Sequence, residues 1–91
     1  MRGTIAGFDT KDYVITAKAD QQMTLHLSST NPSTYFVIQS INGRALDMNE
    51  TVEWSERLTE SGDYVIRVFM MRSAARRKGA VARFALKISI Q

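Results

Sequence analysis

The 91-residue sequence contains no cysteine, one proline and one histidine. The absence of cysteine excludes disulfides, zinc–thiolate sites and cysteine nucleophiles, although it leaves the cellular compartment undetermined. No apolar run approaches the ~18 residues that a membrane-spanning helix needs, so no membrane contact is predicted. The first four residues contain no apolar signal core, so we expect either a cytosolic protein or one whose leader has been removed.

Few residues are suited to catalysis. The single histidine, His26, falls at an outward strand position, where a surface role is expected. The carboxylate pairs Asp9 with Asp12 and Glu53 with Glu56 have the residue type that glycosidases hold about 5–10 Å apart. However, acids at turns usually accept local backbone hydrogen bonds. The five glycines are scattered and form no phosphate-binding loop. We therefore predict that the protein is not an enzyme and uses no metal or other cofactor.

The net charge of +3 conceals a strong asymmetry along the chain. Residues 1–66 contain five Lys and Arg against nine Asp and Glu, a balance of −4, whereas residues 67–91 contain seven cations and no acid. Such an asymmetry marks where an anionic partner would dock. A solvated cationic edge that deters strand-to-strand aggregation is the simpler alternative.

Alternating apolar and polar residues run through most of the chain and predict short strands. Seven or eight such strands, spaced by turn signals, favour a small all-β antiparallel β-sandwich, which we expect to form a single domain over residues 1–91. The only helical candidate is a turn within residues 72–78. Polar turns are predicted at residues 9–12, 42–43 and 49–50. The predicted strands cover residues 4–8, 13–18, 23–28, 35–41, 44–48, 51–58, 64–71 and 83–90.

The strand at residues 64–71 leads directly into a basic loop. Its alternation places Tyr64, Ile66 and Val68 on an inner face, and four cations without an anion follow between Arg72 and Lys78. If the loop begins with a helical turn, residues four apart in this loop share one face. Guanidinium groups can grip carboxylates or phosphates through two hydrogen bonds, so the loop is a candidate binding element.

Several segments resemble the bacterial proteinaceous inhibitors of goose-type and invertebrate-type lysozymes. The similarity covers nearly the whole chain, and its most specific part is the basic stretch. The segments that carry it are Gly3-Thr4-Ile5-Ala6-Gly7-Phe8-Asp9, Asp12-Tyr13-Val14, Ala17-Lys18-Ala19, Asn31-Pro32, Ser61-Gly62-Asp63-Tyr64, Ile66-Arg67-Val68 and Met71-Arg72-Ser73-Ala74-Ala75-Arg76-Arg77.

This resemblance implies a periplasmic protein, exported behind a cleaved leader, that inserts its basic loop into the acidic substrate cleft of a lysozyme. Goose-type inhibitors can carry a tyrosine where this chain has Phe8, and Ser61 with Tyr64 matches a motif tied to the invertebrate-type class. The invertebrate-type target is therefore slightly favoured. The lysozyme-binding residues that the resemblance implies are Arg72, Arg76, Ser61, Tyr64, Phe8, Ser73 and Arg77.

A different class of function remains open, namely a non-catalytic β-sandwich module that binds carbohydrate or a polyanion. Nucleic acid is not the expected partner, because such binders usually spread their cations along a track and residues 1–66 are net acidic. Phe69 and Met71 fall on the outer face of their strand, where they could mark a contact between two copies. The protein is accordingly expected to be a monomer or a homodimer.

Overall fold

The computed structural model describes residues 1–40 and 45–91. Within these residues the chain forms eight strands and one short helix, which confirms the predicted all-β class and the helical turn after the central strand. The elements are β1 (Arg2–Ala6), β2 (Thr10–Ala17), β3 (Gln22–Ser29), β4 (Thr34–Ser40), β5 (Ala45–Thr51), β6 (Glu53–Arg57), β7 (Gly62–Met70), α1 (Arg72–Ala75) and β8 (Val81–Ile90).

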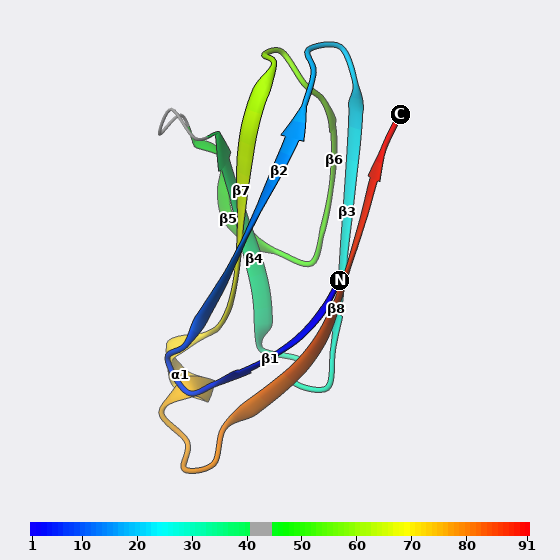
Figure 1. Cartoon of the computed structure of the whole chain (residues 1–91). Coiled ribbons are helices and arrows are strands. Elements are labelled where there is room, and N and C mark those ends of the chain that lie inside the picture. Colours follow the sequence, from blue (N-terminus) through cyan, green and yellow to red (C-terminus); the bar gives the residue numbers. More distant parts are fainter. Residues whose placement is uncertain (41–44) are drawn as a thin grey trace.

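The strands form two four-stranded antiparallel sheets packed face to face (Figure 1). One sheet has the order β1-β8-β3-β6 and the other has the order β2-β7-β4-β5. The chain changes sheets repeatedly, so strands that follow one another in sequence often lie in different sheets. The molecule is elongated along the strands, with a long axis of 43 Å against 22 and 17 Å.

The core lies between the inner faces of the two sheets. In β7 the inner residues Tyr64, Ile66 and Val68 are buried, as the alternation predicts. In β3 the inner residues are equally buried, and the outward-facing His26 is exposed, as predicted. Because strand side chains alternate in direction, the period of two alone decides which residues fill the core.

The first turn differs from its prediction. Residues 9–12 were expected to form a polar turn, but β2 already begins at Thr10. The turn falls earlier, at Gly7 and Phe8, where Gly7 has a φ of 57°. β2 is an edge strand, and its outward side chains face water, so Asp12 is compatible with a strand that the polar composition did not suggest.

The region between β5 and β6 also differs from its prediction. Residues 49–50 were expected to turn, but they belong to β5. Alternation over the strand predicted at residues 51–58 places Val52 on one face with Trp54, but Val52 is 39% exposed whereas Trp54 is buried. The chain bends at Val52 because β5 lies in one sheet and β6 in the other. The hairpin turn predicted at residues 42–43 lies outside the described residues.

Candidate functional site

The basic loop begins as soon as β7 ends. The backbone N–H of Met71 donates to the carbonyl of Ser33 at 2.8 Å, which fastens the end of β7 to the β3–β4 loop. The N–H groups of Ala74 and Ala75 then donate to the Met71 carbonyl at 3.0 and 2.9 Å and close the first turn of α1. Both alanines are buried. Their small side chains allow the helix to lie close against the end of the sandwich.

The cations of this segment all point away from the core. Arg72, Arg76, Arg77 and Lys78 are exposed, and within the described residues none of their side chains has a hydrogen bond or an ion pair. Four unpaired positive charges within seven residues produce a local positive potential that attracts an anionic partner. This end of the sandwich is therefore the strongest candidate for a binding site.

The buried alanines and the exposed residues lie on opposite sides of α1. At 3.6 residues per turn, Arg72 and the C-cap residue Arg76 project from one side of the helix and Ser73 from the neighbouring side, and Arg77 follows the C-cap. The buried Ala74 and Ala75 occupy the rest of the turn. The predicted sharing of one face by Arg72 and Arg76 thus follows from the helical conformation of residues 72–75.

Phe8 lies at the same end of the molecule. The Gly7 N–H donates to the carbonyl of Ala80 at 2.9 Å, and so the β1–β2 turn is tied to the loop that follows α1. Phe8 is 66% exposed, which is an unusually high fraction for an aromatic side chain. An exposed ring beside uncompensated cations provides an apolar contact within a charged surface, a combination typical of protein interfaces.

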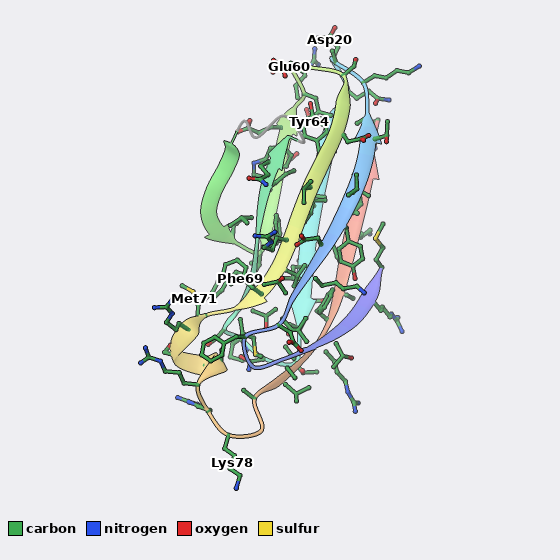
Figure 2. The ribbon with its side chains drawn as sticks, turned by 60° about the vertical axis from the view of Figure 1, so that its left-hand side comes forward. Asp20, Glu60, Tyr64, Phe69, Met71 and Lys78 are labelled. Atoms are coloured by element: carbon green, nitrogen blue, oxygen red, sulfur yellow. The ribbon has the colours of Figure 1, made fainter. Side chains whose placement is uncertain are left out.

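Ser61 and Tyr64 lie at the opposite end of the sandwich. Figure 2 shows Tyr64 and Glu60 at one end and Lys78 at the other. Arg72 follows Tyr64 by eight positions of mostly extended chain, which corresponds to a span of about 26 Å at ~3.3 Å per residue. The structure thus brings together five of the seven predicted binding residues and leaves two apart. The five at the α1 end are Phe8, Arg72, Ser73, Arg76 and Arg77.

The hydroxyl groups of Ser61 and Tyr64 are both used within the protein. Ser61 Oγ accepts a hydrogen bond from the Ala19 N–H at 2.9 Å and so joins the β2–β3 and β6–β7 connections. The Tyr64 hydroxyl donates to the carbonyl of Glu60, and its ring is buried. This is the bond by which a tyrosine corner pins the turn before its own strand.

The carboxylate pairs and His26 show no catalytic arrangement. Asp12 is bound by Arg67, with Nε to Oδ1 at 2.8 Å, and the hydrogen bond from Arg67 lowers the pKa of Asp12. His26 Nδ1 lies 3.5 Å from a carboxylate oxygen of Glu53 on an open sheet face. No group of residues suited to hold a metal ion occurs in the part of the chain that the structure describes. No helix within that part is long and apolar enough to cross a membrane.

One part of this end was missed by the sequence analysis. The β3–β4 loop at residues 30–33 lies beside α1 and contributes one wall of a groove there. In the sequence, the Asn31-Pro32 pair stands out only as one of the segments that carry the resemblance. Its position next to the basic segment depends on how the two sheets are connected, and local sequence does not report that.

Comparison with solved structures gives the chain clear relatives, although no family model and no curated protein sequence matches it. The Aeromonas hydrophila protein PliG, a periplasmic lysozyme inhibitor of g-type lysozyme, is 31% identical over 100% of this chain and 83% of its own, with a TM-score of 0.87. Salmonella Typhimurium PliG, at 21% identity, and a mutant of Escherichia coli PliG, at 24%, share the fold. Their TM-scores are 0.71 and 0.70, and the match covers 100% of this chain with 88% and 85% of theirs. The chain belongs to the PliG family of periplasmic lysozyme inhibitors.

Proposed function

We propose that this protein inhibits a g-type lysozyme by placing the α1 end of its sandwich over the substrate cleft of the enzyme. The observation that carries the proposal is the set of four exposed cations, unpaired among the described residues, beside the exposed ring of Phe8. Family membership places the protein in the periplasm, in agreement with the predicted compartment. Because the family consists of inhibitors, the prediction that the chain is not an enzyme is confirmed.

The g-type target replaces the slight preference for an invertebrate-type lysozyme. That preference is not confirmed, since the matched structures are inhibitors of g-type lysozyme. Two further observations weaken the reason for the invertebrate-type preference. Ser61 and Tyr64 lie far from the basic end, and their hydroxyl groups form hydrogen bonds within the protein. Phe8 keeps the aromatic ring at the position where goose-type inhibitors can carry a tyrosine.

The chemistry of a lysozyme cleft suits the two arginines. Hydrolysis of a glycosidic bond depends on carboxyl groups that flank the scissile bond, so the cleft presents negative charge. Arg72 and Arg76 project from one side of α1 and can pair with such carboxylates through charge-assisted hydrogen bonds. α1 follows directly on the central strand β7, so the arginines approach the cleft from a well-ordered support. Inhibition then needs only that the saccharide be excluded.

The test is a titration of purified protein into a g-type lysozyme while peptidoglycan lysis is followed, with an invertebrate-type and a chicken-type lysozyme in parallel. Inhibition of the g-type enzyme at a near-equimolar ratio is expected. We expect Arg72→Ala or Arg76→Ala to cost at least ~1.5 kcal/mol of binding, about tenfold in affinity. Lys87→Ala, which removes an exposed cation of β8, is the matched control. Unchanged inhibition by the Arg72→Ala/Arg76→Ala double variant would contradict the proposal.

The unpaired cations also keep a second candidate open, a module that binds a polyanion without any lysozyme. Binding of that kind is dominated by charge and falls steeply with added salt. It would be seen as retention on a polyanion column that the double variant loses, together with no inhibition of any lysozyme. The oligomeric state stays a prediction, and the half-buried side chains of Phe69 and Met71 on the outer sheet face are where a second copy would be sought.

A further inference from the structure

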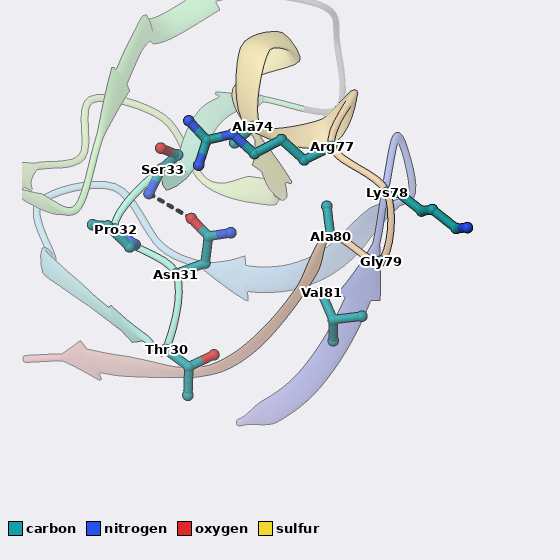
Figure 3. Close-up of a pocket in the computed structure, with 10 residues that line it drawn as sticks. All are labelled: Thr30, Asn31, Pro32, Ser33, Ala74, Arg77, Lys78, Gly79, Ala80 and Val81. Atoms are coloured by element: carbon teal, nitrogen blue, oxygen red, sulfur yellow. Dashed lines mark hydrogen bonds between the residues drawn. The ribbon is translucent and has the colours of Figure 1, made fainter.

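A groove of about 390 Å³ lies between the β3–β4 loop and the segment that runs from α1 to the start of β8. One wall is the β3–β4 loop with Asn31 and Pro32, and the other is formed by Ala74, Arg77 and the start of β8 (Figure 3). The groove therefore adjoins the proposed binding surface, but neither Arg72 nor Arg76 lines it. Neither the charge pattern nor the family assignment gives it a role.

The β3–β4 wall is held in place by its own hydrogen bonds. Asn31 Oδ1 accepts from the Ser33 N–H at 2.9 Å, and Ser29 Oγ accepts from the Asn31 N–H at 3.1 Å. The Ser33 carbonyl accepts from Met71, at the base of the opposite wall, at 2.8 Å. These bonds fix the distance between the walls and the orientation of the Asn31 amide, so the groove is present before any partner binds.

Two of the residues that line the groove, Arg77 and Asn31, carry side-chain N–H donors. Figure 3 shows the Arg77 side chain reaching toward Ser33 and Asn31, whereas Lys78 points away from the groove. The Oδ1 of Asn31 already accepts a hydrogen bond from the Ser33 N–H. The Nδ2 of Asn31 donates to the sulfur of Met70 at 3.4 Å, and a thioether sulfur is a weak acceptor. Arg77 and Asn31 therefore offer N–H groups from opposite walls, and none of the residues that line the groove is acidic.

We propose that this groove receives a carboxylate side chain from the surface of the lysozyme, at the rim of the substrate cleft. The carboxylate would accept from the Arg77 guanidinium on one wall and from the Asn31 amide on the other. This proposal rests on the proposed function, and it assigns the groove and the Arg72–Arg76 pair to different parts of the enzyme. Arg72 and Arg76 would occupy the cleft, while Arg77 and Asn31 would select enzymes that carry an acid at the rim.

Three variants test the groove through the inhibition constant against a g-type lysozyme. Arg77→Ala removes the guanidinium donors of one wall. Asn31→Asp keeps an oxygen that accepts from the Ser33 N–H, but it replaces the donating amide nitrogen of the other wall by an oxygen. Lys87→Ala, an exposed cation of β8 that does not line the groove, lowers the net charge by the same amount and serves as the control. A hydrogen bond to a charged group contributes more free energy than an exposed charge does. We expect the first two variants to weaken inhibition at least about tenfold and the control less than about fivefold.

A second measurement identifies the carboxylate itself. Acidic residues at the rim of the lysozyme cleft are changed one at a time to amides and titrated with wild-type protein and with Arg77→Ala. One such change is expected to weaken binding of the wild type but to have little further effect on Arg77→Ala, since two residues in contact are not additive. Additivity of Arg77→Ala with every rim variant would overturn the proposal.

The outcomes separate this proposal from the proposed function. If the wild type inhibits while Arg77→Ala and Asn31→Asp behave like Lys87→Ala, the groove has no such role and the inhibitor function stands. If the wild type does not inhibit, both proposals fail. Loss of binding to anionic lipid vesicles in Arg77→Ala, with unchanged inhibition, would assign the groove to a lipid surface instead and overturn it. Melting curves of each variant exclude unfolding as the cause.

Discussion

Arg67 of β7 holds Asp12 of the neighbouring edge strand β2 through two hydrogen bonds, with Nε to Oδ1 at 2.8 Å and Nη2 to Oδ2 at 3.0 Å. The two residues face each other in the β2–β7 register, on the outer side of the sheet. The cation that begins the basic C-terminal part of the chain is thus neutralised, unlike the four cations of the α1 end. The cations available to a partner in residues 67–91 are thus more concentrated at the α1 end than the sequence suggests.

This pair predicts a pH dependence of stability. The hydrogen bond from Arg67 lowers the pKa of Asp12 in the folded protein below its value of about 3.9 in the unfolded chain. The pair therefore stabilises the fold fully above pH ~4, and the contribution is lost as the pH falls through the lower, folded-state pKa. The side chains are 51% and 41% exposed, so the contribution is at most ~1 kcal/mol.

The measurement is the free energy of unfolding by urea of wild type and Asp12→Asn at pH 7 and at pH 3. The wild type is expected to be the more stable at pH 7, and the difference is expected to shrink at pH 3. A difference that grows toward low pH would contradict the lowered pKa of Asp12.

Two tyrosines with opposite surroundings give a matched pair of variants. Tyr64→Phe removes a hydroxyl that donates to the Glu60 carbonyl, and it is expected to cost ~1 kcal/mol or more. Tyr13→Phe removes a hydroxyl that is buried and has no partner within the described residues, and it is expected to raise stability by up to about 1 kcal/mol. Burial also raises the pKa of Tyr13.

Melting curves and inhibition measured well below the melting temperature separate stability from binding in these variants. For Tyr64→Phe we expect a lower melting temperature and unchanged inhibition. Loss of inhibition without loss of stability would instead make Tyr64 a lysozyme contact, as the resemblance implies.

Even an alanine in place of Gly3 in β1 is predicted to destabilise the fold. A β-carbon at this position would lie 2.7 Å from the tip of the Phe84 ring and 3.2 Å from the Tyr13 hydroxyl. The two rings pack edge to face with centroids 6.3 Å apart, so neither can move without disturbing the other. Gly3→Ala is expected to cost ~1–3 kcal/mol, as overpacked cores do.

A double variant tests the cause. Phe84→Leu removes the ring tip that the new methyl group meets, so Gly3→Ala should cost less in that background than in the wild type. Equal costs in the two backgrounds would show that the close approach to Phe84 is not the reason.

Much of the fold could be predicted because one face of each strand is buried. Alternation in residues 64–70 and 23–27 identified the inner residues, since a period of two is all that a half-buried strand requires. Residues 9–12 and Val52 were misassigned for a different reason. An exposed edge strand tolerates polar residues as a turn does, and the change of sheet at Val52 is set by tertiary connections.

The candidate site was predictable only in part. The cluster from Arg72 to Lys78 was visible as composition, and the nine residues of β7 already imply that Ser61 and the cluster lie at opposite ends. The groove was not visible, because Asn31 and Arg77 are 46 positions apart and meet only through the packing of the β3–β4 loop against α1. Sites assembled from loops of both sheets leave no local pattern in the sequence.

Phe8 provides the most direct test of where the binding surface ends. Phe8→Ala removes a ring that is 66% exposed in the β1–β2 turn, so it is expected to leave the free energy of unfolding within ~0.5 kcal/mol of the wild type. Because the turn is bonded to the loop after α1, the same change is expected to weaken inhibition by ~1–2 kcal/mol, about 5–30-fold. Phe8→Tyr, which keeps the ring and adds a hydroxyl at an exposed edge, should inhibit at least as well.

The control is Val14→Ala, which truncates an exposed apolar side chain of β2, several residues further along the strand. It should change neither stability nor inhibition by more than ~0.5 kcal/mol. If Phe8→Ala and Val14→Ala inhibit equally well, the interface does not reach the β1–β2 turn. The lysozyme would then contact only the α1 side, and the apolar part of its footprint would have to come from the exposed side chains of Pro32 in the β3–β4 loop and Val81 at the start of β8.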